Sequence, residues 1–372
     1  MEIKTKNEEH EHIREMWLDA DTRVSRLAVI DYSMRIGSIQ VNMAGIGGVE
    51  THYQHRMKGY MRTLFEDTVH YMMDGDYEVS MLFGIENFYT KFGYASALAT
   101  SQFTIKTRDA EVAAERAGKY SSRPIQPDDM PAVLALYNAN NAGCTGSIVR
   151  TVENFAEFRK GTWYGTPAET ALWEDQAGEL LGYMVWDKYP KGVKVAELEA
   201  REAALFPAML SALAEQAITK RCESITVFMP PDHPFGEFAQ RYGIEWTLTY
   251  PRYGSGMMRI LNQKPLFGKL IPELEQRLAA SSLAGYSGAF DFRTDLGVTS
   301  LTFENGALTV GETATSKFLA LSQDKLMQLI VGYRSVRDVC NDAGVQMAGA
   351  IEPLLQVLFP KTFAYPWLAD HF

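Results

Sequence analysis

The sequence has few cysteines and no long apolar run. Its three cysteines, Cys144, Cys222 and Cys340, are far apart and odd in number. They provide neither a disulfide framework nor the paired spacing of a zinc site, so a reducing compartment is expected. No apolar run approaches the ~20 residues that a membrane-spanning helix requires. The acidic N-terminus also lacks the pattern of a signal peptide. We therefore expect a soluble, cytoplasmic protein with no membrane partner.

An excess of positive charge is missing as well. The formal net charge is -10, which argues against broad nucleic-acid binding and suits a protein that attracts small cations. Apolar residues make up 46% and aromatic residues 12% of the chain, which indicates sizeable buried cores and not disorder. The chain of 372 residues is longer than a domain with a single hydrophobic core usually is, so two or three domains are expected.

The phosphate-binding loop G-x-x-x-x-G-K-[ST] is absent, but residues 47–67, "GGVETHYQHRMKGYMRTLFED", suggest another anion site. They begin as an apolar strand and become a basic turn before a helix, without a G-x-G-x-x-G motif. The helix N-terminus and its free N–H groups favour an anion. Arg56, Lys58 and Arg62 add charge, and Gly59 permits close approach of a phosphate. Taken alone, a solvated basic turn is the commoner explanation.

The first 110 or so residues alternate between strand and helix patterns. Residues 1–6 predict a strand, and 7–20 predict a helix with Ile13, Met16 and Trp17 on one face. The later predictions are two strands in 25–51 that turn near Gly37, a helix in 59–75, a strand in 78–84, and a short helix leading into a strand in 86–97. This order indicates a mixed α/β layer architecture.

A second copy of this unit follows residues 107–122, which have the composition of a polar linker. "FAQRYGIEWT" (238–247) aligns with "FYTKFGYASA" (88–97), and a strand precedes each of them. The second copy has no basic glycine turn and has Ala239 where the first has Tyr89. We predict that only the first copy keeps a site.

The pattern changes again from about residue 263. A helix in 270–280, an alternating meander in 288–312 with an Asn-Gly turn, and a capped helix in 322–333 predict helices on an antiparallel sheet. The predicted domains are therefore 1–118, 119–262 and 263–372.

Together, the turn Arg56-x-x-Gly59 and "FYTKFGY" some thirty residues later resemble the GNAT acetyltransferase superfamily. Its turn has the pattern R/Q-x-x-G-x-G/A, from which Met61 departs. Two GNAT-like units, the second degenerate, and a unit similar to sterol carrier protein resemble the enhanced intracellular survival (Eis) acetyltransferases, as does the aromatic C-terminal residue. The resemblance implies an α/β (α+β) fold of tandem GNAT-like mixed-sheet domains followed by a sterol-carrier-protein-like α+β domain.

The resemblance also implies a co-substrate, acetyl-CoA, and roles for named residues. Tyr89 would protonate the leaving thiolate, and the terminal carboxylate of Phe372 would accept the proton of the amine. The Val49 N–H would polarise the thioester carbonyl. The expected cofactor-binding residues are Gly48, Val49, Glu50, Thr51, Arg56, Met57, Lys58, Gly59, Tyr60, Met61, Arg62, Gly84 and Ile85.

Each of these roles has a simpler structural alternative. Tyr89 lies between two phenylalanines and could be an ordinary core residue, and chain ends usually fray. The tail "PKTFAYPWLADHF" is nevertheless aromatic enough that we expect it to be docked. His52 and His55 are three residues apart, but no Cys or carboxylate cluster completes a metal site, and none is expected.

The substrate prediction carries one departure from the Eis-like pattern. The first predicted helix ends near Ala20 and a strand begins near Ser25, which leaves no room for a second helix that would wall the acceptor pocket. We predict N-acetylation of a primary amine, such as an aminoglycoside, a polyamine or a lysine-like amine, by direct attack. The alternatives are a non-catalytic acyl-CoA sensor and, less favoured, a lipid-binding module. By resemblance the chain forms a homo-oligomer, a hexamer.

Overall fold

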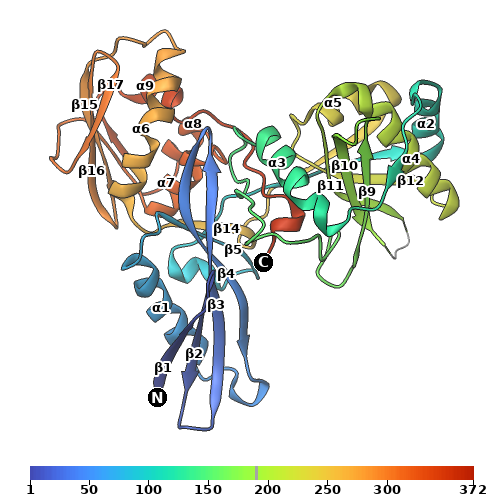
Figure 1. The fold of residues 1–372 in the computed structure, drawn as a ribbon. Coiled ribbons are helices and arrows are strands. Elements are labelled where there is room, and N and C mark those ends of the chain that lie inside the picture. The colour runs from blue at the N-terminus through green and yellow to red at the C-terminus, as the bar shows by residue number, and fades with distance from the viewer. Residues whose placement is uncertain (189–191) are drawn as a thin grey trace.

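In the computed structural model, residues 1–188 and 192–372 are described, and their strands form two seven-stranded sheets and one five-stranded sheet (Figure 1). The C-terminus lies at the centre of the molecule, close to β4 and β5, where the three units meet (Figure 1). None of the described helices is both long and apolar enough to cross a membrane.

The first sheet has the strand order β1-β2-β3-β4-β5-β14-β6. Its strands are β1 (Glu2–Asn7), β2 (Glu11–Trp17), β3 (Arg23–Ile36), β4 (Ile39–Thr51), β5 (Val79–Gly84), β6 (Ala95–Ser96) and β14 (Ser255–Ile260). One face is covered by α1 (Tyr60–Met73), whose buried side chains are those that the helical spacing predicts: Leu64, Phe65, Thr68, Val69 and Met72. The short 3-10 helix η2 (Tyr89–Phe92) follows β5.

The predicted helix over residues 7–20 is wrong. Residues 11–17 form β2, which pairs antiparallel with both β1 and β3. Their burial follows a period of two, since Arg14 and Met16 are both buried on one face. β1 therefore joins β2 through a short turn at residues 8–10, so neither the predicted helix nor a second helix lies between the first strands.

The second sheet has the order β13-β7-β12-β11-β10-β9-β8. Its strands are β7 (Thr100–Lys106), β8 (Ser122–Arg123), β9 (Ala168–Glu174), β10 (Leu180–Asp187), β11 (Val193–Ala200), β12 (Ser224–Phe228) and β13 (Ile244–Thr249). Its helices are α2 (Thr107–Glu111), α3 (Met130–Asn140), α4 (Phe206–Thr219) and α5 (Pro234–Ala239). The predicted linker over 107–122 is wrong in its first half, because residues 107–116 are helical and bury Ala110 and Ala113.

The two large sheets exchange a strand. β7 follows β6 along the chain but lies in the second sheet, between β13 and β12. β14 follows β13 but lies in the first sheet, between β5 and β6. The two units are thereby interlocked, and the predicted boundary at residue 118 stays a prediction.

The third unit has a sheet of order β17-β16-β15-β18-β19 with helices packed against it. Its elements are α6 (Gln263–Ala279), β15 (Gly288–Thr294), β16 (Gly297–Glu304), β17 (Ala307–Gly311), β18 (Phe318–Ala320), α7 (Gln323–Ile330), α8 (Val336–Cys340), β19 (Gln346–Ala348) and α9 (Glu352–Leu358). The predicted meander is present, and its Asn305-Gly306 turn has positive φ at both residues. Because β15 and β18 run parallel, the sheet is mixed and not purely antiparallel.

Candidate active site

An opening in the first sheet lies between the ends of β4 and β5. These parallel strands pair from Met43 with Val79 to Ile46 with Leu82, and beyond that they are no longer paired. β4 carries a bulge in the same place, because Gly48 and Val49 together face one residue of β3. Gly48 has φ 57, a conformation that favours glycine. Such a bulge leaves backbone groups without a ladder partner and available to a ligand.

The basic turn lies between this bulge and α1. Gly59 caps α1 with φ 84, and no atom lies within 4 Å of the position where a Cβ would stand. Arg56, Lys58 and Arg62 are exposed, and none of them forms an ion pair with the described residues. Arg56 Nε donates to the carbonyl of Thr51 at the end of β4, 3.2 Å away. The helix N-terminus is thus open, positively charged and next to the bulge, as an anion site requires.

Tyr89 lies on the α1 face of the sheet at the end of β5. Its ring is buried between Phe65 and Phe88, with centroid separations of 5.4 and 4.9 Å. It also fills the space beside Gly84, where any Cβ would collide with the ring. Burial raises the pKa of Tyr89, so the phenol keeps its proton at neutral pH. Its hydroxyl makes no hydrogen bond to a residue that the structure describes, which leaves it available to a ligand.

The C-terminal residue lies on the other face of the same opening. The ring of Phe372 stacks on Tyr32 at 5.2 Å and meets the edge of Phe83 at 5.5 Å. A Cβ on Gly45 would stand 2.8 Å from Cζ of Phe372, and a Cβ on Gly47 would stand 3.6 Å from its carboxyl carbon. The terminal carboxylate therefore lies beside β4 just before the bulge.

Alternation along β5 explains why Tyr89 and Phe372 are on opposite faces. Leu82 and Gly84 point toward the side of Tyr89, whereas Phe83 points toward the tail and stacks on His371 at 3.7 Å. A reacting group held between the ends of β4 and β5 would have a phenol on one side and a carboxylate on the other.

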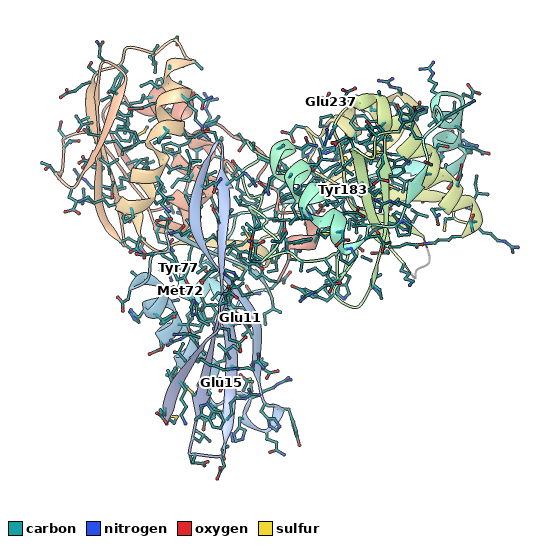
Figure 2. The ribbon with its side chains drawn as sticks, viewed as in Figure 1. Glu11, Glu15, Met72, Tyr77, Tyr183 and Glu237 are labelled. Carbon is teal, nitrogen blue, oxygen red and sulfur yellow. The ribbon has the colours of Figure 1, made fainter. Side chains whose placement is uncertain are left out.

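A cavity of about 560 Å³ adjoins the tail. The turn between β1 and β2, the middle of β3, the segment 148–164 and the tail form its walls. Glu11, which belongs to this lining, is labelled in Figure 2 beside the junction of the units. The acidic lining residues are Glu8, Glu9, Glu11, Asp31, Glu153, Glu157 and Asp370, and the basic ones are His10, Arg150, Arg159, Lys160 and His371.

Lys160 connects this cavity to the tail. Its ammonium donates to the backbone carbonyl of His371 and lies 3.8 Å from the ring centroid of Tyr164. Burial lowers the pKa of Lys160 to about 8, while the nearby Asp370 carboxylate opposes the shift.

Sequence reasoning missed the residues that receive the tail. Gly45 and Gly47 are two apart in "AGIGGV", so they lie on one strand face, and this spacing was a readable signal. Tyr32 and Phe83 gave no signal of their own. Of the expected cofactor residues, Ile85 is 71% exposed at the mouth of the opening. His52 and His55 have ring centroids 5.9 Å apart, and within the described ranges no three His, Cys, Asp or Glu residues gather as metal ligands would.

Comparison with known proteins assigns this region. Residues 3–97 match the family described as acetyltransferase (GNAT) domain. This stretch of the chain is therefore similar to a GNAT acetyltransferase domain. The matched span contains the bulge of β4, the basic turn and Tyr89. No curated protein sequence matches the chain.

Several solved structures resemble this chain over nearly its whole length. A probable N-acyltransferase from Enterococcus faecalis is 16% identical, with a TM-score of 0.78 over 98% of this chain and 90% of that one. A GCN5-related N-acetyltransferase from Anabaena variabilis is 17% identical, with a TM-score of 0.72 over 97% of this chain and 89% of that one. Eis1 from Mycobacterium abscessus is 14% identical, with a TM-score of 0.65 over 98% of this chain and 91% of that one. These likenesses confirm the predicted fold class, whereas the likeness of the third unit to sterol carrier protein stays a prediction.

Proposed function

We propose that the chain transfers the acetyl group of acetyl-CoA to a primary amine. The observation that carries this proposal is the placement of Tyr89 and the carboxylate of Phe372 on opposite faces of the opening between β4 and β5. The basic turn beside the same opening supplies the place for the co-substrate.

Coenzyme A fits the chain from the turn to the opening. Its pyrophosphate would bind at residues 56–62, where three exposed cations that form no ion pair with the described residues lie at the N-terminus of α1. Its pantetheine arm would extend along Gly48, Val49, Glu50 and Thr51 as an added strand and pass Gly84 and Ile85. The thioester carbonyl would then accept a hydrogen bond from the Val49 N–H, which stabilises the negative charge that develops on the oxygen.

The reaction is direct attack in a ternary complex. The neutral amine forms a bond to the thioester carbon, and the bond from that carbon to sulfur breaks. The amine proton passes to the Phe372 carboxylate, and the leaving thiolate takes the Tyr89 proton. No described residue that lines the cavity is a cysteine, and burial raises the pKa of the Cys144 thiol to about 11, so a cysteine-bound acetyl intermediate is not favoured.

The cavity beside the tail is the candidate acceptor site. Glu9 comes from the turn between β1 and β2, Glu11 is the first residue of β2, and Glu153 comes from the second unit. Acidic walls attract cationic amines such as aminoglycosides, polyamines or lysine-like compounds.

The test is release of free coenzyme A thiol from acetyl-CoA in the presence of a panel of such amines. Thiol release with one of them, together with the matching acetylated product, supports the proposal. Binding of coenzyme A without release with any amine would instead identify an acyl-CoA sensor. The direct turn between β1 and β2, which places no helix beside the cavity there, favours that second candidate. Lipid binding without coenzyme A binding would contradict both.

A further inference from the structure

The second unit holds the C-terminal tail through a buried charged cluster. Arg150, Glu197 and Asp370 have side chains that are 0%, 0% and 3% exposed. The guanidinium donates to both carboxylate oxygens of Glu197 at 2.7 Å, and its Nε donates to Oδ1 of Asp370 at 2.6 Å. Asp370 belongs to the tail, whereas Arg150 and Glu197 belong to the second unit.

Two tyrosines complete this cluster. Tyr137 of α3 donates to Oδ2 of Asp370 at 3.0 Å, and Tyr183 of β10 donates to Oε1 of Glu197 at 2.6 Å. Tyr183 is labelled in the second unit in Figure 2. The guanidinium also lies 3.7 Å from the ring centroid of Tyr137. Each carboxylate oxygen of the pair therefore has a donor, which a buried charge requires.

Other tail residues are held by the same unit. Trp367 is fully buried, and its indole N–H donates to Oδ1 of Asn141 at 2.8 Å. Lys160 donates to the carbonyl of His371. Residues 367, 370 and 371 are thus each fixed from the second unit, and the carboxylate that follows them lies at β4 of the first unit.

A buried ion cluster of this kind is a poor source of stability, because the desolvation of its charges offsets most of their attraction. What it supplies is one fixed arrangement, since a shifted tail would leave Arg150 or Asp370 buried without a partner. Fixed placement matters for a proton acceptor, where a displacement of about 1 Å can cost ~100-fold in rate.

We propose that Arg150, through Asp370, is a positioning residue for the terminal carboxylate, and that holding the tail is a role of the second unit. The proposal rests on the proposed function in one respect, namely that this carboxylate accepts the proton of the amine.

Asp370→Asn is the informative variant, because it keeps the shape of the side chain and leaves the pair of Arg150 and Glu197 intact. Asp370→Glu keeps the charge. Asp291→Asn is a matched control, because Asp291 is fully buried and paired with Arg293 at 2.9 Å in the third unit, with no contact to the tail.

The first measurement is release of Phe372 by a carboxypeptidase from the full-length protein, followed by mass, which needs no enzymatic activity. We expect release at least tenfold faster in Asp370→Asn, partly restored protection in Asp370→Glu, and no change in Asp291→Asn. The second measurement is amine acetylation, where kcat of Asp370→Asn falls about 100-fold while KM for acetyl-CoA is unchanged. Equal protection of Phe372 in Asp370→Asn and the native chain would overturn the proposal, as would faster release with an unchanged kcat.

A chain extended by one residue after Phe372 separates this proposal from the proposed function. If the extended chain turns over as fast as the native one, the carboxylate is not the base, and both the base assignment and the positioning role fail. If the extended chain is inactive while Asp370→Asn is fully active, the base assignment stands and only the positioning role is refuted.

Discussion

Replacing Tyr89 with phenylalanine should separate a chemical role from a packing role. The ring would still fill the space between Phe65 and Phe88, and the lost hydroxyl bonds no described residue. The free energy of unfolding should therefore change by no more than about 0.5 kcal/mol. If the phenol protonates the thiolate, kcat should fall about 100- to 10,000-fold, which corresponds to roughly 3–5 kcal/mol of transition-state stabilisation.

Tyr94 provides the matched control, because it is fully buried in the same aromatic cluster and its hydroxyl donates to Ser80 Oγ at 2.6 Å. Tyr94→Phe should cost about 1 kcal/mol of stability through that lost hydrogen bond and leave kcat within about twofold. Thiol release gives the rates, thermal unfolding gives the stabilities, and titration with coenzyme A verifies that binding is unchanged. Unchanged turnover in Tyr89→Phe, or an equal loss of rate in Tyr94→Phe, would refute the role of Tyr89.

Three other perturbations address the turn and the tail. Gly45→Val should displace the ring of Phe372 and lower kcat at least tenfold. Gly47→Ala should lower kcat far less, because its Cβ would stand at an ordinary contact distance of 3.6 Å from the carboxyl carbon of Phe372. The measurement is the ratio of the two kcat values. Arg56→Ala should raise the Kd for coenzyme A about tenfold by calorimetry but leave the Kd for pantetheine unchanged, since only the former carries phosphates. Burial, reinforced by the charge of Lys160, lowers the pKa of His371 to about 3. His371 of the released tail binds a proton near pH 6.5, whereas His371 of the docked tail does not. Docking of the tail is therefore strongest above pH 6.5 and weakens as the pH falls toward 3. Carboxypeptidase should release Phe372 about tenfold faster at pH 5.5 than at pH 7.5.

The failure of the predicted helix over 7–20 has a physical cause. Ile13, Met16 and Trp17 are spaced like a helical face, but the strand buries Arg14 together with Met16. The guanidinium of Arg14 donates to the carboxylate of Asp67 and to the hydroxyls of Thr5 and Thr68, and Asp67 and Thr68 belong to α1, more than 50 residues away. A sequence pattern ordinarily counts an arginine as solvent-exposed, which hides the alternation of buried residues in β2. The strand could therefore be recognised only once the residues that bind Arg14 were known.

The basic turn and Tyr89 could be predicted because their signals are local. A glycine with positive φ, unpaired cations and a helix start lie within a few residues, and the aromatic cluster follows β5 directly. The exchange of β7 and β14 carried no such signal, because both strands pair with strands that lie far from them in the sequence. Strand composition indicates burial but not which sheet provides the neighbours.

The placement of the terminal carboxylate depends on a local sequence signal and on contacts between distant residues. The aromatic tail predicted docking, but its position depends on contacts between residues far apart in the sequence, such as Arg150 with Asp370 and Phe372 with Gly45. Arg150 lies in an irregular segment after α3, where the sequence alone does not distinguish it from a surface arginine. The second unit has no basic glycine turn, and Ala239 stands where the first unit has Tyr89. Because a buried ion cluster contributes little net stability, the contact of Arg150 with Asp370 is better explained by the fixed position that it gives the tail.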